Sequence, residues 1–244
     1  MKKSCILFVV MNMVSLTSWA MAPVEKHMLY VSQGMSDFYM FQLSNGDQRY
    51  FRQFEKHQAL ATHSEIKIKG IENLKLTEEW RSLNSRLQQI EFKNDEVFVA
   101  GVLRRQYREY LTNLYLAVTK ENTSEHSQED VVDKIQLLTA MLGARTLDVA
   151  SDYYGPGSLT DHDNLFEAEK ATQQVSKDIS WLMSQEISQV NKSSLRKLSL
   201  KFNFIRGNLV DYHSQTPYFL IYKNMNSMHK ILTENNLERL VVSE

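Results

Sequence analysis

Apolar residues recur at intervals of three and four along most of this chain, the spacing that places them on one face of an α-helix. The pattern is sharpest near the C-terminus, where the intervals alternate strictly, first through Leu195, Leu198, Phe202, Ile205, Leu209 and Tyr212 and then through Ile221, Met225, Met228 and Leu232. Such stripes pack against neighbouring helices. We therefore predict two helices here, with Thr216 as the cap of the second and Pro217 in its first turn.

Looser stripes predict four further helices in the preceding part of the chain. The first is expected from His27 to about Thr62, on an apolar face made by Leu43, Tyr50, Phe54 and Ala61. The second begins at a Thr77 cap and runs to about Thr119, with an interruption at Asn94-Asp95. Its apolar face consists of Trp80, Leu83, Leu87, Ile90, Leu103, Tyr107, Tyr110, Leu114 and Val118. Between these two helices, Ile66, Ile68 and Ile71 fit a connecting loop or a short strand.

The third of these helices starts near Ser127 and stops at Gly155-Pro156-Gly157, the strongest helix breaker in the chain. Its stripe consists of Val131, Ile135, Leu138, Leu142 and Val149. The fourth has Thr160, Asp161 and Asp163 at its N-terminus and continues through Val175, Ile179, Leu182 and Val190. The pattern as a whole predicts an all-α protein, an elongated antiparallel bundle of about five to six long helices within residues 21–244.

Composition agrees with this fold class, because three prolines and eight glycines in 244 residues leave long segments without a helix breaker. Residues 1–20 follow a different pattern, in which Lys2 and Lys3 precede an apolar run from Cys5 to Val14, and small residues at Ser18 and Ala20 suit a signal peptidase. We predict a signal peptide cleaved near Ala20 and export to the periplasm. A cut after Ala22 and an uncleaved N-terminal anchor are the alternatives.

Removal of residues 1–20 would leave 26 of the 28 basic residues beside 29 acidic ones, and would remove Cys5, the single cysteine. A mature chain with a small negative net charge is not expected to bind nucleic acid or anionic lipid. It also has no means of forming a disulfide. No later segment approaches the ~18 consecutive apolar residues of a membrane span, so no transmembrane helix is expected after cleavage.

Motifs for metals and for catalysis are absent from the sequence. No His follows an acid by three residues, as in di-iron bundles, and no two His residues are spaced by four. The segment Asp161-His162-Asp163-Asn164 lacks the remaining ligands of an EF-hand and is better explained as acids at a helix N-terminus. We therefore predict a protein without cofactor and without enzymatic activity.

Two arginines are candidates for a binding site. Arg145 lies one turn after Leu142 on an apolar stripe, and Arg49 follows Gly46 by three residues on the predicted first helix. A guanidinium close to a bundle interior needs an acid or an anionic ligand beside it. An ion pair with Asp148 or Glu55 is the more frequent outcome for such a residue, and an anion site is the alternative.

The segment Asn45-Gly46-Asp47-Gln48-Arg49-Tyr50-Phe51-Arg52-Gln53 resembles the first-helix signature of the periplasmic sensor module of PilJ-type pilus chemotaxis transducers and NarX-type nitrate sensors. A weaker similarity occurs at Leu142–Leu147. The resemblance implies that Gly46, Gln48, Arg49, Gln53 and Arg145 are ligand-binding residues. It also implies that Arg49 contacts an oxyanion at a helical dimer interface, and hence a homodimer.

Two functions follow as expectations. The first is a non-enzymatic periplasmic sensor or binding module that recognises a small, oxyanion-like ligand or a partner related to type IV pili and chemotaxis, such as a membrane receptor protein. The alternative is a periplasmic protein-interaction or assembly factor without a small ligand. A secreted enzyme whose catalytic residues meet only in three dimensions is the least favoured class.

Overall fold

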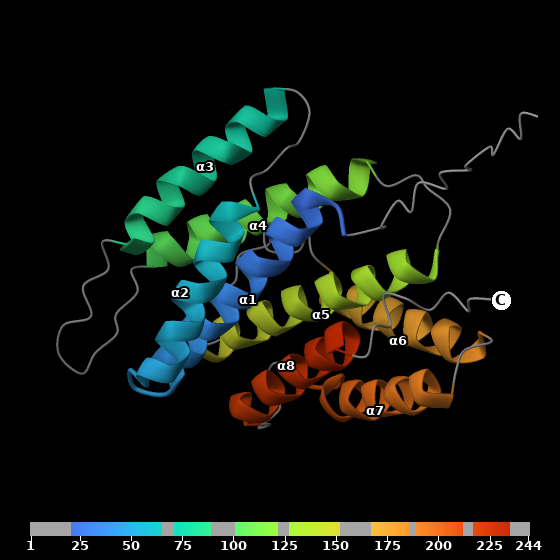
Figure 1. The fold of residues 1–244 in the computed structure, drawn as a ribbon. Coiled ribbons are helices and arrows are strands. Elements are labelled where there is room, and N and C mark those ends of the chain that lie inside the picture. Colours follow the sequence, from blue (N-terminus) through green and yellow to red (C-terminus); the bar gives the residue numbers. More distant parts are fainter. Residues whose placement is uncertain are drawn as a thin grey trace, which may run out of the picture.

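A computed structural model describes residues 21–64, 71–88, 101–121, 127–151, 167–185, 189–211 and 217–234 of the protein. Within these ranges the secondary structure consists of eight helices and no strand (Figure 1). The helices are α1 (Pro23–Leu43), α2 (Gln48–His63), α3 (Ile71–Gln88), α4 (Gly101–Glu121), α5 (Gln128–Ser151), α6 (Ala168–Ser184), α7 (Gln189–Ile205) and α8 (Tyr218–Glu234). The predicted all-α class is confirmed.

The single helix predicted from His27 to Thr62 is wrong, because the chain reverses between α1 and α2. Asn45 and Gly46 both have positive φ, at 54° and 88°, which no helix allows. The amide of Gly46 donates to the carbonyl of Phe41 at 2.9 Å, closing the C-terminus of α1. Asp47 then caps α2 by accepting a hydrogen bond from the amide of Arg49 at 2.9 Å.

Two further boundaries differ from the predictions. α3 begins at Ile71 rather than at the Thr77 cap, and α6 ends at Ser184, so that Val190 belongs to α7. The described ranges hold eight helices where five or six were expected, because the first predicted helix corresponds to α1 and α2 and the second to α3 and α4. Several predicted features lie outside the described residues, namely the signal peptide, Ile66 and Ile68, Asn94-Asp95, Gly155-Pro156-Gly157, Thr160 to Asp163, Tyr212 and Thr216.

The clearest sequence signals correspond to buried positions. Ser127 and Asp130 exchange hydrogen bonds of 3.0 and 3.1 Å between side chain and amide, a capping box at the start of α5. The predicted stripes of the last two helices are buried at Leu195, Leu198, Phe202, Ile205, Leu209, Ile221, Met225, Met228 and Leu232. Leu209 lies in the turn after α7 and still packs into the core.

α1 and α5 lie at the centre of the molecule and pack against each other (Figure 1). α2 and α4 cover α1, whereas α6 and α8 cover α5. α3 packs on α4 at one end of the molecule, and α7 packs on α6 and α8 at the other. No helix in the described ranges combines the length and the apolar character needed to cross a membrane.

Candidate functional site

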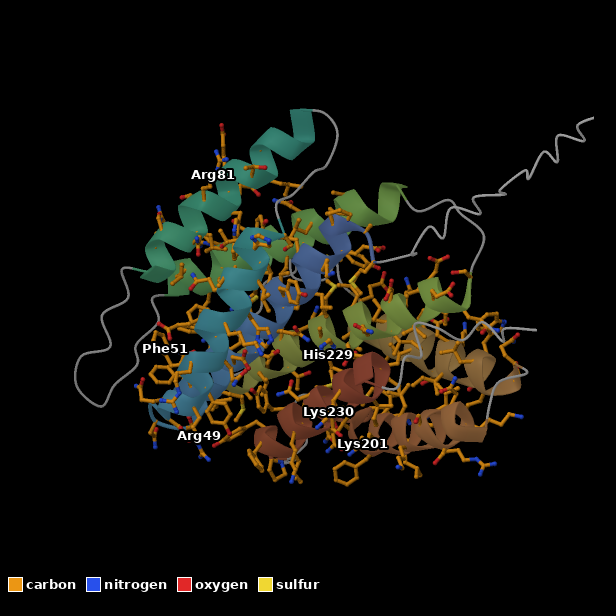
Figure 2. All side chains as sticks on the ribbon, in the orientation of Figure 1. Arg49, Phe51, Arg81, Lys201, His229 and Lys230 are labelled. Atoms are coloured by element: carbon orange, nitrogen blue, oxygen red, sulfur yellow. The ribbon has the colours of Figure 1, made fainter. Side chains whose placement is uncertain are left out.

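The predicted ligand-binding arginine lies at the surface, in the first turn of α2. The side chain of Arg49 is 78% exposed, and Figure 2 shows it projecting from the turn between α1 and α2. Its Nε donates to both carboxylate oxygens of Asp47, at 3.1 and 3.0 Å, and its Nη2 donates to Oδ2 at 2.6 Å. These hydrogen bonds lower the pKa of Asp47 to about 2. The carboxylate of Asp47 thus occupies the fork that an oxyanion would use.

The other predicted site residues do not surround a common cavity with Arg49. Gln48 and Gln53 are exposed on α2, and the Gln48 side chain donates to the carbonyl of Gly46 at 3.4 Å. Gly46 forms the turn itself. Arg145 lies half-buried on α5, a helix that packs on α1. The ligand-binding role of these five residues stays a prediction.

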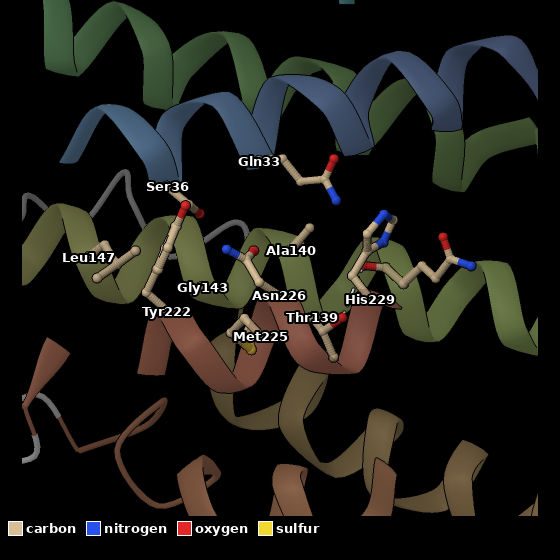
Figure 3. A pocket seen from close by; sticks show the side chains of 11 residues that line it. Gln33, Ser36, Thr139, Ala140, Gly143, Leu147, Tyr222, Met225, Asn226 and His229 are labelled. Carbon is tan, nitrogen blue, oxygen red and sulfur yellow. Dashed lines mark hydrogen bonds between the residues drawn. The ribbon is translucent and has the colours of Figure 1, made fainter. Parts of the chain in front are cut away.

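A pocket lies where α1, α5 and α8 meet (Figure 3). The space between its walls, including the part open to solvent, is about 370 Å³. The cavity volume measured with a water-sized sphere is about 20 Å³. The enclosed part therefore has room for about one water molecule, and a larger ligand would also occupy the open part of the pocket. Its walls are formed by Gln33, Ser36, Gln136, Thr139, Ala140, Gly143, Leu147, Tyr222, Met225, Asn226 and His229.

Small residues on α5 form the wall of the pocket that faces α8. A methyl group at Gly143 would lie 3.1 Å from Cε of Met225, closer than side chains normally approach, so glycine lets α8 come near α5. Ala140 lines the same wall one turn earlier. A larger side chain at either position would occupy the space between the helices.

Three buried polar atoms of the pocket residues have no hydrogen-bond partner in the described structure: Oε1 of Gln33, Nε2 of Gln136 and Nδ1 of His229. Gln33 is 9% exposed and Gln136 only 3%. In Figure 3, Gln33 extends from α1 toward His229 on α8. Because an unpaired buried polar atom costs about 1–3 kcal/mol, a water or another small polar molecule that reached these atoms would stabilise the structure.

The protonation state of His229 defines the chemistry of the pocket. Burial, together with the nearby His57, lowers the pKa of His229 to about 4. The imidazole is therefore neutral at pH 7, with one nitrogen able to donate and the other able to accept. No Lys or Arg lines the pocket. Its walls thus offer a donor, an acceptor and a neutral ring, and no positive charge.

A buried carboxylate orients the pocket wall formed by Tyr222. The hydroxyl of Tyr222 donates to Oδ1 of Asp37 at 2.6 Å, and Nδ1 of His57 donates to Oδ2 of the same carboxylate at 2.6 Å. Burial and the charge of Asp37 raise the pKa of Tyr222. Asp37 thereby ties α8 and α2 to α1 beside the pocket.

A second buried polar cluster, formed by Arg104, Arg108, Asp148 and Tyr39, was not predicted. Nε of Arg104 donates to Oδ1 of Asp148 at 2.9 Å, and Nε of Arg108 lies 2.7 Å from Oδ2. The Arg104 guanidinium also lies over the ring of Tyr39, 5.6 Å from its centre. Asp148, which was expected as one possible partner for Arg145, accepts a hydrogen bond from Arg104 of α4. The cluster joins α4 to α5 and contacts α1 through Tyr39.

The part of the chain that the structure describes holds no group of three His, Cys, Asp or Glu residues that could bind a metal ion. Comparisons with protein-family models, with curated proteins and with solved structures give no match. The similarity of residues 45–53 to the PilJ/NarX-type signature therefore stays an expectation. The arrangement of the pocket residues is the observation from which a function is argued.

Proposed function

We propose that this protein is a non-enzymatic binding module that holds a small, uncharged polar molecule in the pocket between α1, α5 and α8. The observation that supports this proposal is the set of unpaired atoms around the pocket, with Oε1 of Gln33 as acceptor and Nε2 of Gln136 as donor. The neutral ring of His229 can serve as a further hydrogen-bond donor or acceptor. A ligand with a donor beside an acceptor, such as a small primary amide, complements these groups.

The proposed setting is the periplasm, where the module would act as a sensor. The pattern of residues 1–20 supports export, and the resemblance of residues 45–53 to sensor modules supports a signalling role. In this proposal Arg49, at the exposed start of α2, contacts a pilus- or chemotaxis-related partner or a second copy of the chain. An oxyanion ligand is less well supported by the geometry, because it would have to displace the Asp47 carboxylate.

Thermal unfolding of the full chain, measured with millimolar small amides and separately with nitrate, tests the ligand. Binding to the native state raises the midpoint of unfolding. We expect amides to raise it and nitrate to have no effect. Ala140→Leu should remove the amide effect, because the larger side chain fills the pocket.

Ala150→Leu is the matched control, since Ala150 is an exposed residue of the same helix and does not line the pocket. It should keep the full response to amides. The proposal fails if Ala140→Leu and Ala150→Leu respond equally. Stabilisation by nitrate that disappears in Arg49→Ala would instead favour the oxyanion version. No response to any ligand would favour the assembly factor.

A further inference from the structure

The solvent-facing side of α7 carries two large apolar side chains surrounded by basic ones. Leu200 is 71% exposed and Phe204 is 58% exposed, and they lie one turn apart. Arg196, Lys197 and Lys201 flank them on the same side of the helix. We call these five residues the basic-apolar face of α7. The opposite side of α7 is buried at Leu195, Leu198, Phe202 and Ile205, so this orientation is fixed by the core.

The charge around this face has one sign. No acidic residue occurs between positions 189 and 210. Residues 189–234, which contain α7 and α8, have seven basic and two acidic residues, whereas the whole chain has 28 basic and 29 acidic residues. The described structure has no ion pair at Arg196, Lys197 or Lys201. The positive charge of the face is therefore not neutralised within these described parts.

Exposed apolar residues continue past the end of α7 toward α8. Val210 lies in the turn after the helix, and Tyr218 and Phe219 begin α8; all three are exposed. Figure 1 shows α7 and α8 side by side at the end of the molecule opposite α3. In Figure 2 the Lys201 and Lys230 labels lie on this same end. These residues lie at the same end of the molecule as the basic-apolar face of α7 and are not counted as part of it.

We propose that the basic-apolar face of α7 docks on an anionic phospholipid membrane. The basic side chains would lie among the lipid phosphates, while Leu200 and Phe204 enter the boundary between headgroups and acyl chains. Apolar side chains at the centre with cations on both flanks are the arrangement of an interfacial helix. This proposal differs from the expectation from net charge, because the net charge averages a basic segment with the more acidic rest of the chain.

Other anionic partners fit the face less well. A stable protein interface needs a well-packed apolar centre of larger area, and the exposed centre of α7 offers two side chains on a convex helix. Single-stranded nucleic acid would require successive aromatic side chains for base stacking, and the centre of this face has only Phe204. The proposal is independent of the pocket between α1, α5 and α8.

Co-sedimentation of the full chain with vesicles tests the proposal. Phosphatidylcholine vesicles are compared with vesicles in which phosphatidylglycerol replaces about a third of the lipid. The readout is the ratio of binding to the two kinds, because the apolar run at Cys5 to Val14 would bind both alike. We expect clear preference for the anionic vesicles, decreasing as salt is raised.

Two double variants and two controls locate the contact. Lys197→Glu with Lys201→Glu should weaken binding to anionic vesicles by about tenfold or more, and Leu200→Ser with Phe204→Ser should weaken it several-fold. Arg52→Glu with Lys56→Glu, an exposed pair with the same spacing on α2, and Met183→Ser, exposed on α6, should leave it unchanged. Equal binding of all variants, no preference for anionic vesicles, or binding to an acidic protein or nucleic acid alone would overturn the proposal.

Discussion

His27 is a buried residue whose two ring nitrogens are both engaged. Nδ1 donates to the carbonyl of Ala61 at 2.7 Å, and Nε2 accepts from the hydroxyl of Tyr110 at 2.7 Å. The ring also meets Trp80 edge-on, with centres 5.0 Å apart. This single residue therefore joins α1, α2, α3 and α4 in its neutral form.

The burial of His27 predicts a specific dependence of stability on pH. Burial lowers its pKa from 6.5 to about 4, so between these values the unfolded chain binds the proton more strongly. Its contribution is complete above pH 6.5 and is lost as the pH falls through about 4. We expect the free energy of unfolding, measured by urea denaturation, to fall by on the order of 3 kcal/mol across this window for His27.

His229 contributes in the same direction and the same window, because burial and His57 also lower its pKa to about 4. His27→Asn should make the decrease between pH 6.5 and 4 smaller. His63→Asn serves as the control, since His63 is exposed at the end of α2 and should leave the pH dependence unchanged. A decrease of equal size in both variants would show that His27 is not responsible.

At the scale of elements, the turn between α1 and α2 depends on one glycine. Gly46 has a φ of +88°, a conformation that costs other residues about 1–2 kcal/mol. We expect Gly46→Ala to lower the free energy of unfolding by that amount in denaturant titration. Gly207→Ala is the control, because a methyl group there meets nothing within 4 Å. Equal effects at the two positions would contradict the strain argument.

The buried pair of Arg104 and Asp148 connects α4 to α5. We therefore expect substitutions of Arg104 and of its neighbour Arg105 to differ in their effect on the free energy of unfolding. Arg104→Ala should lower the free energy of unfolding by about 3 kcal/mol, because it removes one partner of a buried charge. Arg105→Ala removes only an exposed pair with Glu109 and should cost under about 0.5 kcal/mol. Thermal or urea unfolding of the two variants measures this difference.

The helices that could be predicted from sequence are those whose regularly spaced apolar residues all pack into the core. Leu195 to Leu209 and Ile221 to Leu232 are buried as their spacing requires. The break after α1 was missed because an apolar stripe can continue in register across a tight turn. Asn45-Gly46, a turn dipeptide, was the available signal.

At the scale of the whole molecule, the candidate site is formed by residues far apart in the sequence. Gln33 and Gln136 come from α1 and α5, and His229 comes from α8. Each is a polar residue on a predicted helix, which sequence can reveal, but their convergence depends on how three helices pack. The predicted residue Arg49 was found by local similarity instead, and it lies on the exposed turn.

The distribution of charge along the chain also differs from what the net charge suggests. The net charge of −1 for the whole chain conceals the excess of basic residues over 189–234. Only the structure shows that Arg196, Lys197 and the partly buried Lys201 lie on the same side of α7 as the exposed residues Leu200 and Phe204. A ligand pocket near the centre and a basic face at one end give the molecule two separate binding surfaces in our proposals.

The most direct test of the pocket is a crystal structure of the full chain grown with acetamide, at a resolution that shows small ligands. The account predicts one acetamide between α1, α5 and α8, with its NH₂ group donating to Oε1 of Gln33 and its carbonyl accepting from Nε2 of Gln136. A closed interface in which Gln33 and Gln136 bond only to protein groups, with acetamide absent, would contradict it.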